Sequence, residues 1–315
     1  MTTIGASSLD VFPLCLGGNV FGWTADKETT FGILDAFTAG GGNLIDTADA
    51  YSKWVPGHTG GESERMIGEW LAARPGTEVM IATKVARHPE FPGLGNVRGA
   101  AEASLQRLGV EVIDLYYAHY DDPDTPLEQA VTAFAELQDA GLIRAIGLSN
   151  FTPDRLRAWM STAADLGVAA PVALQPEYNL VHRNDVEADV APIAADFGLG
   201  MLPYYGLASG FLTGKYRSTE IAEGASPRAK MASAYATPQG LQILDVMERI
   251  AGAHDTTMAS VALAWLREQP YVVAPIASAS RLEQVEGLLA GATLSLTAGE
   301  LEELTVVSDW TPVDI

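Results

Sequence analysis

Four ionisable side chains lie at or just beyond the ends of three apolar runs of the sequence: Asp46, Tyr51, Lys84 and His119. A buried lysine beside an aspartate is expected to lower the pKa of a nearby phenol, which is ordinarily about 10. Tyr51 would then act as a general acid. His119 would hold and polarise a substrate oxygen, so that Tyr51 donates a proton while a hydride arrives from another molecule.

Each of these residues also has a purely structural interpretation. Lys84 and Asp46 could form an ion pair that only stabilises the fold, and His119 could be an ordinary strand-end residue. However, burying ionisable groups costs several kcal/mol unless pairing or function compensates. Four such groups at the ends of three consecutive strands therefore favour an active site.

The elements that would position these residues alternate along the whole chain. Eight short apolar runs have the composition of buried strands, at 14–16, 44–45, 79–82, 112–117, 143–148, 172–174, 200–205 and 272–276. Stretches with helical spacing lie between them, among them 62–73, 98–108, 127–140, 153–166 and 185–197. This alternation predicts an α/β fold with a parallel sheet. Eight units are the number that closes a (β/α)8 TIM barrel, and a doubly wound sheet is the alternative.

Two features of the connections add to this prediction. Thr125 and Thr152 stand where they could cap the helices that start near the next residues. The connection after the seventh strand, 206–237, is unusually long, and loops of that length are usually functional or disordered. It carries four cations against two glutamates, so we expect it to cover phosphate groups: Lys215, Arg217, Arg228 and Lys230.

Composition excludes several classes of protein. The 315 residues carry a net charge of −21, so nucleic acid and acidic membrane surfaces are not expected partners. The one cysteine, Cys15, cannot close an internal disulfide, and five dispersed histidines support no metal site. The uncharged stretch 197–214 holds too many glycines for a membrane span. The amino-terminal residues do not resemble a targeting signal, which predicts a cytoplasmic protein. No linker is found in the sequence, so we expect a single domain over 1–315.

Several motifs together resemble the aldo-keto reductase superfamily, in particular bacterial members, with similarity to the β-subunits of potassium channels. The matching stretches are Asp46-Thr-Ala-Asp-Ala-Tyr51, Gly61-Glu-Ser-Glu-Arg-Met-Ile-Gly68, Ala82-Thr-Lys84-Val, Asp114-Leu-Tyr-Tyr-Ala-His119, Ile146-Gly-Leu-Ser149-Asn150-Phe151, Leu174-Gln175-Pro-Glu-Tyr-Asn179 and Tyr204-Tyr-Gly-Leu207-Ala-Ser-Gly210-Phe-Leu-Thr-Gly-Lys215-Tyr216. They occur in the family's order over most of the chain. The resemblance implies a single (β/α)8 barrel with a catalytic tetrad of Asp46, Tyr51, Lys84 and His119, and Tyr51 as the proton donor.

The resemblance also implies that NADPH binds in an extended conformation without a Rossmann fold. The carboxamide would be held by Ser149, Asn150 and Gln175, and the nicotinamide would stack on Tyr204. The pyrophosphate would lie along Gly206, Leu207, Ser209, Gly210 and Lys215, and the 2′-phosphate among Ser278, Ser280, Arg281 and Gln284. One departure from the family is Leu288, which stands where a polar residue often contacts adenine. Arg281 and the two serines still favour NADPH over NADH.

Four aromatic residues beside the tetrad and nicotinamide positions predict an aromatic-walled substrate pocket: Trp23, Trp54, Tyr120 and Tyr205. The same rings could instead only pack against their neighbours. We therefore expect NADPH-dependent reduction of an aldehyde or ketone to an alcohol, on a small-molecule carbonyl substrate and with no metal. The oligomeric state is unknown from the sequence. One alternative is a cofactor-binding regulatory subunit like the potassium-channel β-subunits, and another is a barrel glycosidase, which would need two facing carboxylates.

Overall fold

The computed structural model describes residues 1–85, 93–220 and 228–309. Its central sheet has eight strands, all parallel, in the order β10-β3-β4-β5-β6-β7-β8-β9. Their bounds are β3 (Cys15–Gly17), β4 (Leu44–Asp46), β5 (Met80–Val85), β6 (Ile113–Ala118), β7 (Ile143–Ser149), β8 (Ala173–Gln175), β9 (Gly200–Met201) and β10 (Ile276–Ala277). Met201 also bridges Val272, shortly before β10, and this contact joins the two edges of the sheet. The predicted eight-stranded parallel barrel is therefore confirmed, with strand ends shifted by a few residues.

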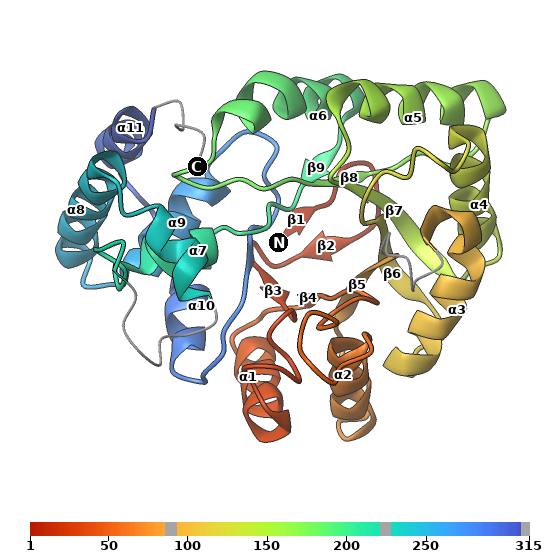
Figure 1. The fold of residues 1–315 in the computed structure, drawn as a ribbon, viewed down its shortest axis with the longest axis horizontal. Coiled ribbons are helices and arrows are strands. Elements are labelled where there is room, and N and C mark those ends of the chain that lie inside the picture. Colours follow the sequence, from red (N-terminus) through yellow and green to blue (C-terminus); the bar gives the residue numbers. More distant parts are fainter. Residues whose placement is uncertain (86–92, 221–227, 310–315) are drawn as a thin grey trace.

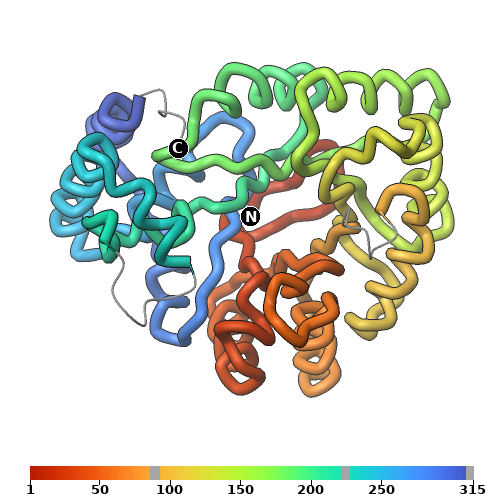
Figure 2. Tube along the Cα trace, in the orientation of Figure 1, coloured from red at the N-terminus to blue at the C-terminus, as the bar shows by residue number. Residues whose placement is uncertain are grey.

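Helices surround the strands on all sides (Figure 1). Those that follow the first six barrel strands are α1 (Lys27–Ala39), α2 (Glu62–Ala72), α3 (Val97–Leu108), α4 (Leu127–Asp139), α5 (Pro153–Leu166) and α6 (Ala191–Phe197). Those after the seventh and eighth strands are α7 (Ala229–Ala234), α8 (Pro238–Ala253), α9 (Met258–Arg267), α10 (Gln284–Thr293) and α11 (Ala298–Val307). In Figure 2 the colours run around the ring in sequence order, and the blue carboxyl-terminal part lies beside the red amino-terminal part. Successive βα units therefore occupy successive positions around the barrel.

Local signals in the sequence explain where some helices begin. Thr152 caps α5 as predicted, because its hydroxyl accepts a hydrogen bond from the Arg155 amide. The expectation for Thr125 is wrong. Its hydroxyl donates to the Asp122 carboxylate instead, and Pro126 stands at the N-cap of α4. The predicted helix over 185–197 divides into a π-helical turn, Val186–Val190, and α6.

The interior of the barrel is filled by apolar side chains and is closed at one end by a hairpin. Strands β1 (Thr2–Thr3) and β2 (Asp10–Val11) pair in antiparallel fashion. The buried side chains of Ile4, Leu9 and Val11 belong to the same cluster as Cys15 and Leu44 of the barrel strands. Gly5 approaches the backbone so closely that a Cβ would lie 2.3 Å from the Val172 carbonyl oxygen. The hairpin therefore seals the barrel and leaves the opposite rim for chemistry.

The long connection after β9 is partly structured. It contains a 3-10 turn, η3 (Ala208–Thr213), and helix α7, while residues 221–227 lie outside the described part of the chain. Within η3, Ser209 and Gly210 have φ values of 56° and 98°, so the backbone turns sharply there. None of the helices in the described residues is long and apolar enough to cross a membrane.

Candidate active site

The predicted site residues lie where the strands end. Asp46 closes β4, Lys84 lies near the end of β5, Ser149 closes β7 and Gln175 closes β8. His119 directly follows β6, and its backbone amide donates to the Val85 carbonyl. The neighbouring strand β5 therefore fixes the position of His119 at the end of β6. Because all these strands are parallel, their carboxyl ends share one rim.

The Lys84 ammonium group is the centre of the arrangement. It is fully buried, and it donates to the Asp46 carboxylate at 2.6 Å, the Thr47 carbonyl at 2.7 Å and the Tyr51 hydroxyl at 3.3 Å. These contacts use all three of its protons. Burial lowers the pKa of Lys84, but Asp46 and Tyr51 outweigh this effect and raise the pKa above its usual range. Lys84 therefore stays charged and holds Tyr51 and Asp46 together.

The Tyr51 hydroxyl keeps its proton more strongly than the sequence analysis predicted. Burial raises the pKa of Tyr51 to about 12. The charge of Asp46 adds to this rise, and the charge of Lys84 opposes it without cancelling it. The expected effect of Lys84 thus has the right sign, but the expected net lowering of this pKa is wrong. At neutral pH, Tyr51 is a protonated phenol that can donate.

His119 is buried and uncharged. Burial lowers its pKa well below the usual value, and the nearby Lys84 lowers it further. Its ring lies 6.1 Å from the Tyr51 ring and stacks on Tyr120 at 4.7 Å between centroids. Within the described part of the chain, its Nδ1 atom has no hydrogen-bond partner. A neutral imidazole in this position can donate one hydrogen bond to a substrate oxygen that also contacts the Tyr51 hydroxyl.

Amide and hydroxyl groups continue the site around the rim. The Gln175 side-chain amide donates to Asp46 at 2.9 Å, and the Ser149 hydroxyl donates to the Gln175 carbonyl at 2.8 Å. The Asn150 side chain donates to the His119 carbonyl at 2.9 Å and accepts from the Tyr204 hydroxyl at 3.0 Å. The structure thus brings together the four residues that the resemblance assigned to the nicotinamide and its carboxamide.

The segments expected at the phosphates also lie next to one another. Gly206 packs closely against the start of β10, because a Cβ there would lie 3.4 Å from the Ile276 carbonyl oxygen. A Cβ on Gly210 would lie 3.4 Å from the end of the Lys215 side chain, so Lys215 folds back over η3. Leu207 stands at the N-cap of η3 and Ser209 lies within this turn, so their backbone amides belong to the same short segment.

The segment after β10 forms a tight turn. The Gln284 side-chain oxygen accepts from the amides of Ser280 at 2.8 Å and Arg281 at 3.1 Å. The Ser278 hydroxyl donates to the Asn19 side chain at 2.8 Å and so joins the loops after the eighth and first strands. Arg281 is exposed and forms no ion pair with the described residues, whereas Leu288 is buried in the core.

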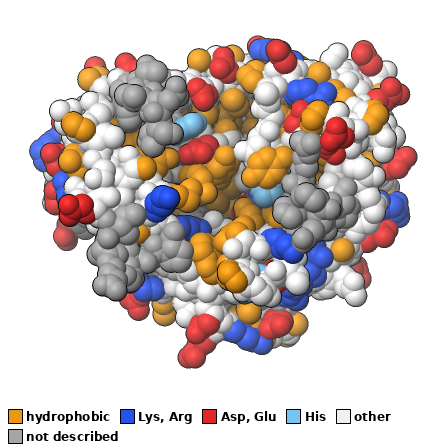
Figure 3. Space-filling view, viewed as in Figure 1, with side chains coloured by type: hydrophobic (Ala, Val, Ile, Leu, Met, Phe, Trp, Pro, Cys, Tyr) orange, Lys and Arg blue, Asp and Glu red, His pale blue; other side chains and the backbone are white. Residues whose placement is uncertain are grey.

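Two of the four predicted pocket aromatics contact the tetrad directly, and the other two contact residues beside it. Trp54 lies 5.7 Å from Tyr51 and 5.6 Å from Trp23 between ring centroids. Tyr205 lies 5.1 Å from Tyr204, and Tyr120 stacks on His119. The face shown in Figure 3 is hollowed at its centre, where hydrophobic side chains gather. An aromatic wall beside buried proton donors suits a planar or apolar carbonyl compound.

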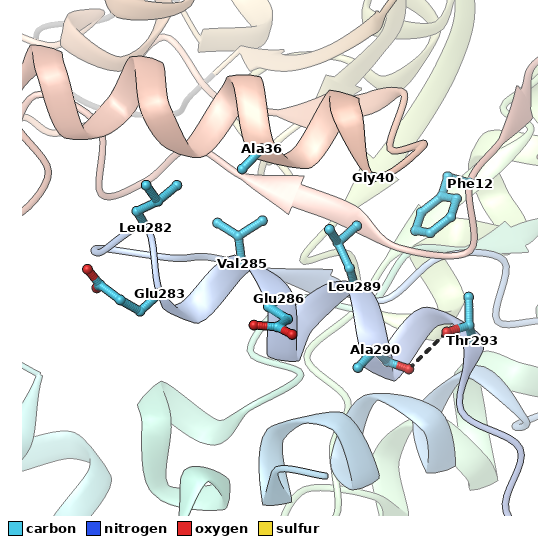
Figure 4. Close-up of a pocket in the computed structure, with 10 residues that line it drawn as sticks. All are labelled: Phe12, Ala36, Gly40, Leu282, Glu283, Val285, Glu286, Leu289, Ala290 and Thr293. Carbon is cyan, nitrogen blue, oxygen red and sulfur yellow. Dashed lines mark hydrogen bonds between the residues drawn. The ribbon is translucent and has the colours of Figure 1, made fainter.

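A groove between α1 and α10 lies apart from this site (Figure 4). Val285 and Leu289 of α10, and Leu282 just before this helix, point toward α1, whereas Glu283 and Glu286 point away. A Cβ on Gly40 would lie 2.3 Å from Leu289, so the glycine allows the two helices to approach. The groove brings no group of polar side chains together, and we assign it to helix packing.

Two contributors to the site were not predicted from the sequence, and one expected contributor is placed elsewhere. Thr47 acts through its backbone carbonyl, which no residue pattern reveals, and Asn19 was not singled out. Arg217, expected near the phosphates, forms ion pairs with Asp245 at 2.8 Å and Glu248 at 2.7 Å on α8. Two carboxylates on the outside of the barrel therefore neutralise the charge of Arg217.

Comparisons with known proteins identify the family of this chain. The family model for the aldo/keto reductase family matches residues 13–309. The chain is 32% identical to norsolorinic acid reductase B of Dothistroma septosporum, over 95% of this chain and 78% of that protein. It is 32% identical to a putative voltage-gated potassium channel subunit beta of Schizosaccharomyces pombe (99% and 94% covered) and 31% identical to the uncharacterized oxidoreductase YrpG of Bacillus subtilis (99% and 95%).

The chain therefore belongs to the aldo/keto reductase family. It is an NAD(P)H-dependent oxidoreductase of the aldo-keto reductase type, in a family that acts on small carbonyl compounds. The resemblance stated from the sequence is confirmed at this level. Bacillus subtilis is one of several organisms among the relatives, so a bacterial origin stays a prediction.

Proposed function

We propose that this protein reduces an aldehyde or ketone to an alcohol with NADPH, and that Tyr51 is the general acid. The observation that carries the proposal is the buried chain of contacts from Asp46 through Lys84 to the Tyr51 hydroxyl, opposite the neutral ring of His119. When bound, NADPH supplies the hydride. The tetrad then has to supply only a proton and stabilise the charge that develops on the substrate oxygen.

Each tetrad residue has a distinct role in this proposal. The Tyr51 hydroxyl donates its proton to the carbonyl oxygen as negative charge develops there. The Lys84 ammonium group stabilises the phenolate that remains, and Asp46 keeps Lys84 charged and oriented. His119, being neutral, donates a hydrogen bond to the same oxygen and positions it.

The residues present fit a nicotinamide cofactor. Ser149, Asn150 and Gln175 would hold the carboxamide, and the half-buried ring of Tyr204 would stack on the nicotinamide. The η3 turn, with Gly206, Leu207, Ser209 and Gly210, would bind the pyrophosphate together with Lys215. Ser278, Ser280, Arg281 and Gln284 would surround the 2′-phosphate. Because Arg281 has no acidic partner among the described residues, it is the candidate for selecting NADPH over NADH.

The proposal is tested by following the loss of reduced-nicotinamide absorbance when the protein meets NADPH and a panel of aromatic aldehydes, ketones and diones. We expect turnover with at least one aldehyde and a higher kcat/KM with NADPH than with NADH. Tight NADPH binding, seen as quenching of protein fluorescence, without turnover of any carbonyl compound would contradict the proposal.

Replacing Arg281 by Ala is expected to weaken NADPH binding by roughly 10- to 100-fold, because a charge-assisted hydrogen bond contributes about 1.5–3 kcal/mol. Binding of NADH, which lacks the 2′-phosphate, should change little. Fluorescence titration with both cofactors measures this difference. Arg249→Ala is the control, since Arg249 is exposed on α8 and pairs with Glu303. An equal loss of affinity for both cofactors would exclude a contact with the 2′-phosphate.

The raised pKa of Tyr51 predicts a characteristic pH profile for reduction. The protonated phenol is the active form, and it persists until the pH approaches the pKa of about 12. His119 stays neutral because its pKa is lowered. We therefore expect kcat for reduction to stay constant from about pH 6 to pH 10 and to fall only above that range. A descending limb with an apparent pKa near 8 would show that Tyr51 is not the acid or that its pKa is not raised.

A regulatory subunit is the second candidate function. The observation in its favour is the 32% identity to a putative voltage-gated potassium channel subunit beta over 99% of this chain. In that case the cofactor site would report redox state to a channel rather than support fast turnover. Co-purification with a membrane channel, combined with very slow reduction of all carbonyl compounds, would favour this function.

We further propose that the protein works in the cytoplasm as a single domain over 1–315. A reducing compartment suits the one cysteine, Cys15, which is buried in the barrel and has no disulfide partner. Separation of the cytoplasmic fraction from the membrane fraction, followed by immunodetection, tests the location. A single cooperative unfolding transition in urea tests the domain organisation.

A further inference from the structure

The loop that carries Tyr51 joins the end of β4 to the start of α2. It has no helix or strand of its own over residues 47–61. Backbone hydrogen bonds within the loop close short turns, for example from the Lys53 amide to the Ala50 carbonyl at 2.8 Å. Such turns set the local path of the chain but not its place on the barrel rim. The position of the Tyr51 hydroxyl therefore depends on contacts between this loop and the neighbouring elements.

Glu62, the first residue of α2, contacts the loop at two places. One carboxylate oxygen accepts a hydrogen bond from the Thr59 amide at 2.9 Å, and the other accepts from the Ser52 amide at 3.3 Å. Ser52 directly follows Tyr51 and is fully buried. The amide of Ser63, the next residue of α2, donates to the Tyr51 carbonyl at 3.5 Å. The peptide group between Tyr51 and Ser52 is therefore bound to the start of α2 through both of its polar atoms.

The Glu62 carboxylate is ionised and is turned toward the loop. Its side chain is mostly buried, with an exposed fraction of 16%, and it also pairs with Arg65 at 3.0 Å. Burial raises the pKa of Glu62, but backbone hydrogen bonds and the nearby Arg65 and His58 outweigh this effect and lower the pKa below its usual range. Glu64, two residues further along α2, pairs with Arg107 of α3 instead. Glu64 thus joins α2 to its neighbouring helix, whereas Glu62 holds the loop.

We propose that Glu62 is a positioning residue for proton donation by Tyr51. Its two oxygens hold both ends of the segment 52–59 against α2, and this keeps the Tyr51 hydroxyl beside Lys84 at the rim. Proton donation needs the hydroxyl within about 3 Å of the substrate oxygen, and a displacement of about 1 Å can lower a rate about 100-fold. The proposal rests on the proposed function and adds to it a residue that acts through Tyr51 rather than on the substrate.

The test is a double-mutant cycle on the rate of hydride transfer, measured in a single turnover with NADPH and 4-carboxybenzaldehyde. Glu62→Gln keeps the size of the side chain but offers only one accepting oxygen to two amides. We expect it to lower the rate by roughly 10- to 100-fold in the wild-type background. In the Tyr51→Phe background we expect a further loss of less than about twofold, because the hydroxyl to be positioned is absent.

Glu69→Gln is the matched control, because Glu69 lies on the same helix and pairs with Lys27 on the surface. Its rate should equal that of the wild-type protein, and NADPH affinity should be unchanged in both glutamine variants. A loss of the same size in both backgrounds would overturn the proposal, because Glu62 would then act on the fold rather than through the Tyr51 hydroxyl. A loss below about twofold in the wild-type background would overturn it as well.

Hydrogen exchange separates this proposal from the proposed function, because it needs no substrate. We expect amides of peptides covering 50–60 to exchange about 10- to 100-fold faster in Glu62→Gln than in the wild-type protein, as follows from the loss of hydrogen bonds to a charged group. Exchange over 64–72 of α2 should change little. Faster exchange confined to the loop would support the role of Glu62 even if no carbonyl compound is reduced. Unchanged exchange would overturn it, and so would equal acceleration over the loop and α2, since Glu62 would then stabilise the helix.

Discussion

Replacing Tyr51 by Phe is expected to lower kcat for carbonyl reduction by about 100- to 10,000-fold, the usual contribution of a positioned general acid. The change removes only the hydroxyl that lies 3.3 Å from the Lys84 ammonium group, and it keeps the ring that packs against Trp54 and His119. Because the hydroxyl acts on the developing charge, KM and the dissociation constant of NADPH should change little. Steady-state kinetics and fluorescence titration measure the two effects separately.

Tyr271→Phe provides the matched control for this experiment. Tyr271 is exposed and lies outside the site, so its hydroxyl should not affect turnover. If Tyr51→Phe retained more than about a tenth of the wild-type kcat, another group would have to supply the proton. If it lost activity together with NADPH affinity, the role of Tyr51 would be in binding rather than in proton donation.

Replacing Lys84 by Met is expected to destabilise the protein by about 3–5 kcal/mol, because removing one partner of a buried ion pair leaves the other charge uncompensated. Both side chains of this pair are almost fully buried, with exposed fractions of 0% for Lys84 and 3% for Asp46. Activity should also fall, since the phenolate of Tyr51 would lose the cation that stabilises it. Urea unfolding and kcat measure the two losses.

The double variant Lys84→Met/Asp46→Asn separates stability from chemistry. Once the aspartate charge is removed, no unpaired charge is buried at this position. We therefore expect most of the free energy of unfolding to return while activity stays low. Lys27→Met is the control, because Lys27 forms an ion pair with Glu69 on the surface and should cost no more than about 1 kcal/mol. A cost below about 1 kcal/mol for Lys84→Met itself would mean that Asp46 is not charged in the folded protein.

The sequence predicted the barrel well where the strands are long and apolar. Strands β5, β6 and β7 are buried over nearly their whole length, so their apolar composition alone indicates buried strands. The hairpin of β1 and β2 was missed, because strands of two residues have no detectable alternation. The helix predicted over 185–197 contains a π-helical turn directly before α6, and the helical spacing of the sequence did not predict this turn.

The candidate site was predicted from the rule that reactive groups follow the strands of a barrel, together with the family resemblance. That rule brings together Asp46, Lys84 and His119 without any knowledge of distances. The pKa of Tyr51 was predicted in the wrong direction, since the depth of burial cannot be read from a sequence and here outweighs the charge of Lys84. The acidic partners of Arg217 could not be foreseen for a similar reason, because α8 lies next to the long connection only in the folded chain.

The most direct test of Tyr51 as the proton donor is a single-turnover measurement of hydride transfer. The wild-type protein and Tyr51→Phe, each saturated with NADPH, are mixed rapidly with excess 4-carboxybenzaldehyde, and the reduced-nicotinamide absorbance is followed. We expect rapid exponential loss in the wild-type protein and a rate at least about 100-fold lower in Tyr51→Phe, with equal amounts of NADPH bound at the start. Equal rates in the two proteins would contradict the role of Tyr51, and no loss in either with this aldehyde or any other carbonyl compound of the panel would contradict carbonyl reduction as the function of this site.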